Sequence, residues 1–386
     1  MKDLSWRFGG RMLRSTFSMT GLAALLLLAG CGGTAAAPAA SGGTGATAGS
    51  GAAKPAASAG ATSAAKPAAS AVKVTIAQSS NSLAFSPVLL ADKHGFFQER
   101  GIQADVVLAG SGSKATAAVV GGSAQVGSTA LGDMVAAVEK GQDIRIFGAT
   151  LVSPGGAVVL KKSIAQKLNV TDSTPIDQRV KALKGLKVSI STPGSATDTN
   201  LRYVLSTYGL DPERDVTILN TGSVENSVAA FAQGAADGAS LTSPAVEQAM
   251  LQNDGIALVN FQEVPELKGQ LSIGLWSSGK WLDANKATAT NVVAAVWKAM
   301  DYMHQSPQES GDVVRKAAWE SLDQKVFDLA WKDELAALPA TPAVTPEGLQ
   351  SQIDFVGASD KRKVNVTPDQ LGTNAIVDAA KQQLGK

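Results

Sequence analysis

Short turns rich in serine, threonine and glycine follow the strand-like segments of this 386-residue chain, and they hold its best candidates for binding chemistry. The first backbone amides of a helix have no partner within the helix, so turns that open helices can present amides and hydroxyls to a ligand. The candidate ligand-binding residues are Ser80, Asn81, Ser82, Phe85, Gly112, Ser113, Ser128, Thr129, Ser195, Ala196, Thr197, Ser223, Thr242 and Ser243. For any single serine, capping of its own helix is an equally good interpretation.

Charged and catalytic side chains are scarce around these turns. Lys114 is their only cation, and its segment lacks the spacing of a phosphate-binding loop. Phe85 and Trp276 can offer aromatic faces to a ligand, although packing in a core explains both as well. No Ser/His/Asp, paired-carboxylate or metal-ligand cluster stands out. We therefore predict no catalytic residue, no metal and no cofactor, and a ligand with one weakly held negative charge or none.

Residues 1–30 predict export and lipid attachment. Basic residues precede an apolar run, 22–28, that ends at Leu28-Ala29-Gly30-Cys31. The run is much shorter than the roughly 20 residues that cross a bilayer, which favours a signal peptide. It resembles the bacterial lipoprotein signal, which implies cleavage before Cys31 and acylation of its thiol. Cys31 is the only cysteine in the chain. A chance cysteine at the end of a discarded signal would keep the export but lose the anchor.

Residues 31–72 predict a flexible tether. From Gly32 to Val72 the chain is almost only Ala, Gly, Ser, Thr, Pro and Lys, and AAKPAASA at 52–59 returns at 64–71. Such a segment has no apolar residues with which to form a core. As a coil of about 41 residues it would span on the order of 35 Å, enough to hold a folded domain clear of lipid head groups.

The remaining chain, residues 73–386, exceeds the usual size of a single core, so we expect two lobes. Strand-like and helical runs alternate in its first two thirds, and the pattern is mainly helical from residue 288, which indicates the α/β class. We expect strands at 72–78, 104–109, 125–128, 144–150, 157–161, 187–191, 216–220 and 256–260. We expect helices at 87–99, 113–121, 131–140, 196–208, 223–232, 313–322, 324–338, 346–357 and 368–384.

The net charge argues against nucleic acid as a partner. The signal carries four basic residues and one acidic, so its removal takes the formal net charge from +1 to −2. No basic run interleaved with aromatic residues is present in the sequence. We therefore expect no nucleic-acid binding.

The motifs over residues 73–275 resemble the nitrate, sulfonate, taurine and thiamine-pyrimidine group of ABC importer binding proteins. They read SPVLLADKHGFF at 86–97, GGSAQVG at 121–127, LKGLKVS at 183–189, GLDP at 209–212 and GAADGA at 234–239. Each is common alone, but their order and spacing are specific. The resemblance implies the type II periplasmic-binding-protein fold, with two lobes joined by a hinge, each a mixed sheet flanked by helices. We assign residues 73–158 and 272–386 to lobe 1 and residues 159–271 to lobe 2.

The resemblance also implies a function. It indicates an extracytoplasmic solute-binding lipoprotein, not an enzyme, that closes around a small molecule and delivers it to an ABC transporter permease. The implied ligand is a small organic or inorganic anion or a heterocycle, of the sulfonate, taurine, nitrate or pyrimidine-precursor class. We expect a monomer attached by its N-terminal lipid to the periplasmic face or outer surface of the membrane.

Two other functions share the fold. One is a solute receptor that presents its ligand to a membrane sensor. The other is an enzyme similar to the thiamine-pyrimidine synthases, whose cysteine-rich motif has no counterpart in residues 73–386.

Overall fold

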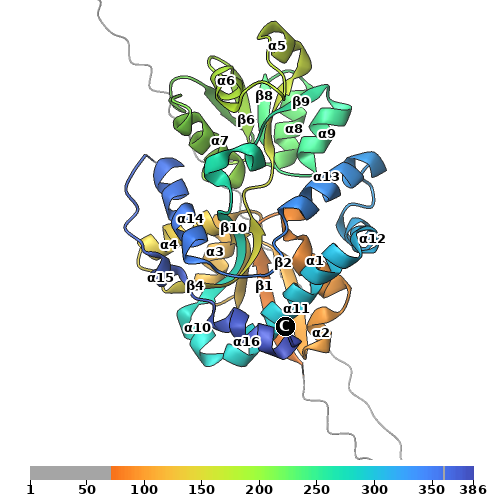
Figure 1. The fold of residues 1–386 in the computed structure, drawn as a ribbon, viewed down its shortest axis with the longest axis vertical. Helices are drawn as coiled ribbons and strands as arrows, with labels where there is room; N and C mark the ends of the chain where they lie inside the picture. The colour runs from red at the N-terminus through yellow and green to blue at the C-terminus, as the bar shows by residue number, and fades with distance from the viewer. Residues whose placement is uncertain (1–70, 360) are drawn as a thin grey trace, which may run out of the picture. The chain divides into compact units, whose positions relative to one another are not determined.

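Two mixed five-stranded sheets organise the part of the chain that the computed structural model describes, residues 71–359 and 361–386 (Figure 1). The predicted signal peptide, Cys31 and the tether up to residue 70 lie outside the described residues, whereas Val72 already belongs to β1. The first sheet contains β1 (Val72–Gln78), β2 (Ile102–Leu108), β3 (Val126–Ala130), β4 (Ile144–Val152) and β10 (Leu271–Ser278). The second contains β5 (Ala157–Lys161), β6 (Lys187–Ile190), β7 (Thr217–Asn220), β8 (Gly238–Leu241) and β9 (Gly255–Asn260).

The two sheets follow the same plan. Their strand orders are β2-β1-β3-β10-β4 and β7-β6-β8-β5-β9. In the first sheet β10 runs antiparallel to both of its neighbours, and in the second β5 does the same. We call the first sheet with its helices lobe 1 (residues 71–152 and 271–386) and the second sheet with its helices lobe 2 (residues 157–267).

Helices flank each sheet. Lobe 1 contains α1 (Ser86–Lys93), α2 (Phe96–Glu99), α3 (Gly112–Val120), α4 (Leu131–Glu139), α10 (Gly279–Ala284), α11 (Lys286–Gln305), α12 (Pro307–Ala318), α13 (Gln324–Ala337), α14 (Pro346–Ser359), α15 (Pro368–Leu371) and α16 (Ala375–Leu384). Lobe 2 contains α5 (Lys162–Lys167), α6 (Ile176–Lys181), α7 (Ala196–Thr207), α8 (Val224–Ala232) and α9 (Ala245–Gln252). Short 3-10 turns η1 (Leu83–Phe85), η2 (Phe261–Glu263) and η3 (Pro265–Leu267) complete the described elements.

The sequence pattern identified eight of the ten described strands within a few residues and missed β8 and β10. β8 reads Gly-Ala-Ser-Leu, and its small residues have little preference for strands. Two predicted helices are interrupted at glycines. Gly95 is left-handed, with φ 81°, and separates α1 from α2. Gly372 pairs with Ile146, whose carbonyl a Cβ at position 372 would overlap, so α15 ends there. The helix predicted at 313–322 instead runs from Pro307 to Ala318.

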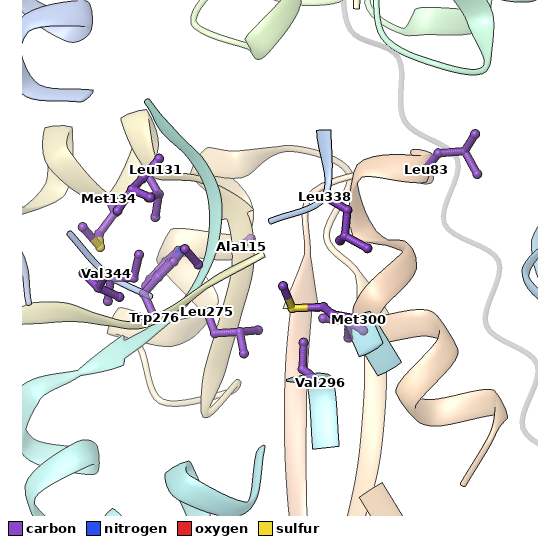
Figure 2. Close-up of a cluster of buried hydrophobic side chains, with 14 of the residues drawn as sticks. Leu83, Ala115, Leu131, Met134, Leu275, Trp276, Val296, Met300, Leu338 and Val344 are labelled. Carbon is purple, nitrogen blue, oxygen red and sulfur yellow. The ribbon is translucent and has the colours of Figure 1, made fainter. Parts of the chain in front are cut away.

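Trp276 is the largest fully buried side chain of the described residues and lies in the core of lobe 1. Figure 2 shows it among the buried side chains of Leu131, Met134 and Val344. Its Nε1 donates a hydrogen bond to Thr129 Oγ1 (3.3 Å). A Cβ on Gly127, its cross-strand partner, would overlap the indole ring, so the glycine makes room for it. Trp276 is therefore a core residue rather than a ligand contact.

The chain crosses between the lobes at two adjacent places. The Ser153 N–H donates to the Gln270 carbonyl (2.7 Å), and the Ser153 hydroxyl accepts from the Gly269 N–H (3.2 Å). Ala157 and Val158 already pair within the second sheet, so the crossing precedes the predicted boundary at residue 158. The proposed hinge action of these crossings stays a prediction.

Candidate ligand-binding cleft

A cavity of about 370 Å³ is lined by residues of both lobes and of the crossing between them. This volume lies within the usual range of small-molecule sites. Polar lining residues include Ser82, Ser113 and Asp133 of lobe 1 and Asn200, Thr242 and Glu247 of lobe 2. Apolar lining residues include Leu151, Val246, Met250, Ile273, Leu329, Phe355 and Val356. The cavity therefore suits a small organic molecule with an apolar body and a few polar groups.

The fold explains why these residues meet. Ser82 follows β1, Ser113 follows β2, and Asp133 follows β3. In lobe 2, Ala196 follows β6 and Thr242 follows β8. Ligands of open α/β sheets bind beyond the carboxyl ends of the strands, and the described cavity occupies that position in both lobes.

Helices α13 and α14 extend from lobe 1 toward lobe 2. Figure 1 shows the two helices on opposite sides of the molecule, between the sheet of lobe 2 above and that of lobe 1 below. Helix α14 packs against α7, and α13 packs against α9. Helix α14 contributes Phe355 to the cavity wall, and α13 contributes Glu334. The C-terminal helices thus form part of the site as well as covering lobe 1.

Five of the predicted residues line the cavity: Ser82, Ser113, Ala196, Thr242 and Ser243. Ser82 is buried, and its hydroxyl donates to the backbone carbonyl of Ser243 (3.2 Å), which joins the two lobes. Ser113 is exposed. The structure therefore brings these residues together from four separate strand ends.

The other candidates in lobe 1 do not line this cavity: Ser80, Asn81, Phe85, Gly112, Ser128 and Thr129. Asn81 is exposed, and Phe85 packs with Leu151 and Ile273 in a small buried cluster. Ser128 and Thr129 are fully buried within β3. A Cβ at Gly112 would overlap the Asp133 carboxyl group, so this glycine gives Asp133 its place.

The remaining candidates in lobe 2, Ser195, Thr197 and Ser223, have local partners. The Ser191 hydroxyl is 2.9 Å from the hydroxyls of both Ser195 and Thr197. Ser223 is the N-cap of α8, and its Oγ accepts from the Asn226 N–H (3.1 Å). None of the three lines the cavity. Capping or turn formation accounts for them in this structure.

Acidic residues in the cavity wall were missed by the sequence reasoning. Asp133, Glu247, Asp333 and Glu334 all line it. Burial raises the pKa of Asp133 and of Glu247 to about 7 each, and a hydrogen bond from Ser243 to Glu247 partly opposes this in the second case. Burial, reinforced by the charge of Glu247, raises the pKa of Glu334 to about 8. Near neutral pH a substantial fraction of the Asp133, Glu247 and Glu334 carboxyl groups is therefore protonated.

One of these acids had a signal in the sequence. Val326, Phe327, Ala330, Trp331 and Ala337 form the buried stripe of α13, and Glu334 lies on the same stripe. An acid at a buried position of an amphipathic helix is unusual and points to a functional or paired group.

No lysine, arginine or histidine lines the described cavity. Lys114, the only cation in the predicted turns, is exposed and is not part of its wall. In the described ranges no group of three or more His, Cys, Asp or Glu residues is placed to hold a metal ion. Over those same residues, no helix has the length and apolar character needed to cross a membrane.

Known proteins share this architecture. The NMT1-like family model matches residues 67–317. YtlA of Bacillus subtilis (strain 168), which is named as a proposed binding protein, is 24% identical over 268 residues, or 66% of this chain and 73% of YtlA. A protein structure from Bordetella bronchiseptica RB50 has 25% identity and a TM-score of 0.68, covering 82% of this chain and 98% of that one. The periplasmic aliphatic sulphonate binding protein SsuA from Escherichia coli has 21% identity and a TM-score of 0.61, covering 77% and 91%.

These comparisons test the predicted fold and the predicted family resemblance. The similar structures align over most of this chain. The matched residues 67–317 include every described strand of both sheets. The two-lobed periplasmic-binding-protein fold and the resemblance to ABC importer binding proteins are confirmed. The chain belongs to the NMT1-like family.

Proposed function

We propose that this protein is the solute-binding component of an ABC importer and that it captures a small organic molecule by closing its two lobes. The observation that carries the proposal is the cavity lined from both lobes. A ligand that contacts both sides binds the closed arrangement better than an open one, and this difference in affinity shifts the population toward closure.

The contacts between the lobes are compatible with reversible closure. Besides the Ser82–Ser243 bond, the Ser359 hydroxyl donates to the Thr199 carbonyl (3.3 Å). The rings of Tyr203 and Phe355 pack at a tilt of 34°, with their centroids 4.8 Å apart. Single hydrogen bonds and aromatic pairs of this kind contribute about 1 kcal/mol each. Contacts of this strength can be broken and remade, so ligand binding can shift the equilibrium between the open and closed arrangements of the lobes.

The lining narrows the ligand class. Sulfonate, taurine, nitrate and a pyrimidine precursor are the ligands that the resemblance implies. A bare anion would find no cation in the described cavity wall and would face four acidic side chains. An organic heterocycle therefore fits this wall better than nitrate or a simple sulfonate.

The proposed place of action is outside the cytoplasm. Leu28 to Cys31 support lipid attachment, and residues 31–72 support a tether long enough to free the lobes from the membrane surface. We propose that the protein acts there as a monomer and delivers its ligand to a permease.

Native mass spectrometry of gently purified protein tests the binding function. We expect a retained small molecule in the spectrum, and small-angle scattering should show a smaller radius of gyration when this molecule is added back to stripped protein. Uptake of the same molecule by cells with and without the protein separates an importer component from a sensor. Absence of any retained molecule, together with an unchanged radius of gyration, would contradict the proposal.

A further inference from the structure

Glu247 and Glu334 approach the cavity from opposite lobes. Glu247 lies on α9 and Glu334 lies on α13, and these two helices pack against each other. Both residues line the cavity, with only 2% and 5% of their surface exposed. Each acid therefore has little contact with water that could solvate its charge.

Oxygen atoms of both side chains lack partners within the described residues. Glu247 Oε1 accepts a hydrogen bond from the Ser243 hydroxyl (2.8 Å), but Glu247 Oε2 has no partner there. Glu334 Oε1 is likewise buried without one. A buried polar group left without a hydrogen bond destabilises the folded chain, and a charged one does so more. Two such groups beside one cavity indicate that their partner comes from outside the chain.

Asn200 is another buried polar residue of the cavity wall, on a different helix of lobe 2 from Glu247. It lies on α7, is 4% exposed and lines the same cavity. Its side-chain amide has no hydrogen-bond partner among the described residues. A buried amide with free donors and acceptors suits a ligand that carries N–H or O–H groups.

The acidic lining of the cavity favours a ligand with a positive charge. Glu247, Asp333, Glu334 and Asp133 line it, and no described cation does. These acids do not gather as a metal-binding group within residues 71–359 and 361–386. The apolar lining near them, including Val246 and Leu329, also favours an organic body.

We infer that the ligand of this cavity is an organic cation, such as a protonated amine, amidine or amino-substituted heterocycle, whose N–H groups donate to Glu247 and Glu334. This inference rests on the proposed function and names the chemical class of its solute. An N⁺–H donor between two carboxylates satisfies their free oxygens and replaces the water that burial has removed. Because the two acids belong to different lobes, the same contact favours closure.

Binding of a cation should release protons. The charge of a bound cation favours the ionised form of nearby carboxyl groups, so the raised pKa values of Glu247 and Glu334 should fall on binding. Asp333 raises the pKa of Glu247, and Glu247 raises that of Glu334, while Lys332 acts on Asp333 and lowers its pKa. Affinity should therefore increase as the pH rises through about 7 and 8.

Calorimetry with three probes of the same ring tests the inference. Benzamidine is cationic, benzamide is neutral and benzenesulfonate is anionic. We expect benzamidine to bind roughly tenfold or more tightly than either of the others and to release protons, seen as a dependence of the heat on the buffer. Glu334→Gln and Glu247→Gln should each weaken benzamidine roughly tenfold and leave benzamide little changed. Glu225→Gln removes an exposed acid outside the cavity wall and serves as the matched control.

The outcomes separate this inference from the proposed function. Tighter binding of benzenesulfonate or benzamide, or a benzamidine preference that survives both glutamine variants, overturns the cationic ligand while solute binding stands. If none of the probes binds, the molecule retained in native mass spectrometry decides: an organic cation supports the inference, and a neutral molecule or anion overturns it. If nothing is bound or retained in any of these measurements, the proposed function fails together with the inference.

Discussion

The hydroxyl of Ser82 donates a hydrogen bond to the backbone carbonyl of Ser243 over 3.2 Å. Ser82 follows β1 in lobe 1, and Ser243 follows β8 in lobe 2. Both residues line the cavity. The bond links one strand end of each sheet and requires the lobes to be close together.

Replacing Ser82 with alanine should favour the open arrangement. The lost bond contributes about 0.5 to 1.5 kcal/mol, so the affinity for the retained ligand should fall roughly twofold to tenfold. Scattering should show a larger radius of gyration for the free variant. Ser80→Ala is the control, because the Ser80 side chain does not line the cavity. Equal affinity of wild type and Ser82→Ala would show that this contact has no part in closure.

Ser113 and Thr242 should act on the ligand rather than on folding. Both line the cavity, and neither hydroxyl has a hydrogen-bond partner within the described residues. Alanine at either position should lower the affinity by about 0.5 to 1.5 kcal/mol in calorimetry, with little effect on urea unfolding. Ser223→Ala should do the reverse, because Ser223 caps α8: unfolding should become easier by about 1 kcal/mol while affinity is kept.

Gly156 should be sensitive to substitution at the crossing between the lobes. Its φ is 108°, and a Cβ there would overlap the Leu241 carbonyl of β8. Gly156→Ala should lower the free energy of unfolding by about 1 to 3 kcal/mol in urea titration, since both strain and overlap act on the second sheet. At Gly155 an added Cβ meets nothing within 4 Å, so Gly155→Ala should have a much smaller effect. Similar losses for both variants would contradict this explanation.

Glu334 should make stability depend on pH. Burial raises its pKa from 4.5 to about 8 in the folded chain, so between these values the folded state holds a proton that the unfolded state has lost. Stability from this group is therefore present at acid pH and is lost as the pH rises through about 8. Glu334→Gln should flatten the dependence and raise the free energy of unfolding near pH 8 by roughly 1 to 3 kcal/mol. Urea unfolding at several pH values measures both effects, and an unchanged pH profile would show that Glu334 is ionised in the folded protein.

Cys31 should be the site of membrane attachment. Leu28 to Cys31 resembles a lipoprotein signal, and Cys31 is the only cysteine in the sequence. Cys31→Ala should leave a precursor that no longer incorporates radioactive palmitate and that accumulates unprocessed. Labelling of this variant would refute the lipoprotein assignment.

Local patterns in the sequence were sufficient for the fold class and for part of the site. Alternating strand and helix signals located β1 and β5 at their observed bounds, because β1 (VKVTIAQ) alternates apolar and polar residues and β5 (AVVLK) is a short apolar run. The rule that ligands bind beyond strand ends identified Ser82 and Thr242 from opposite lobes. Such signals depend only on neighbouring residues, so a single sequence contains them.

Tertiary structure alone decided which hydroxyls face the cavity and what charge surrounds them. Ser113 lies in the first turn of α3 and Ser223 caps α8, each after a strand, yet only Ser113 lines the cavity. Glu334 belongs to the site because α13 returns from lobe 1 to pack against α9, far from it in the sequence. Burial depends on packing between distant segments, so the raised pKa values of Glu247 and Glu334 and the acidic character of the site emerge only when the lobes are assembled.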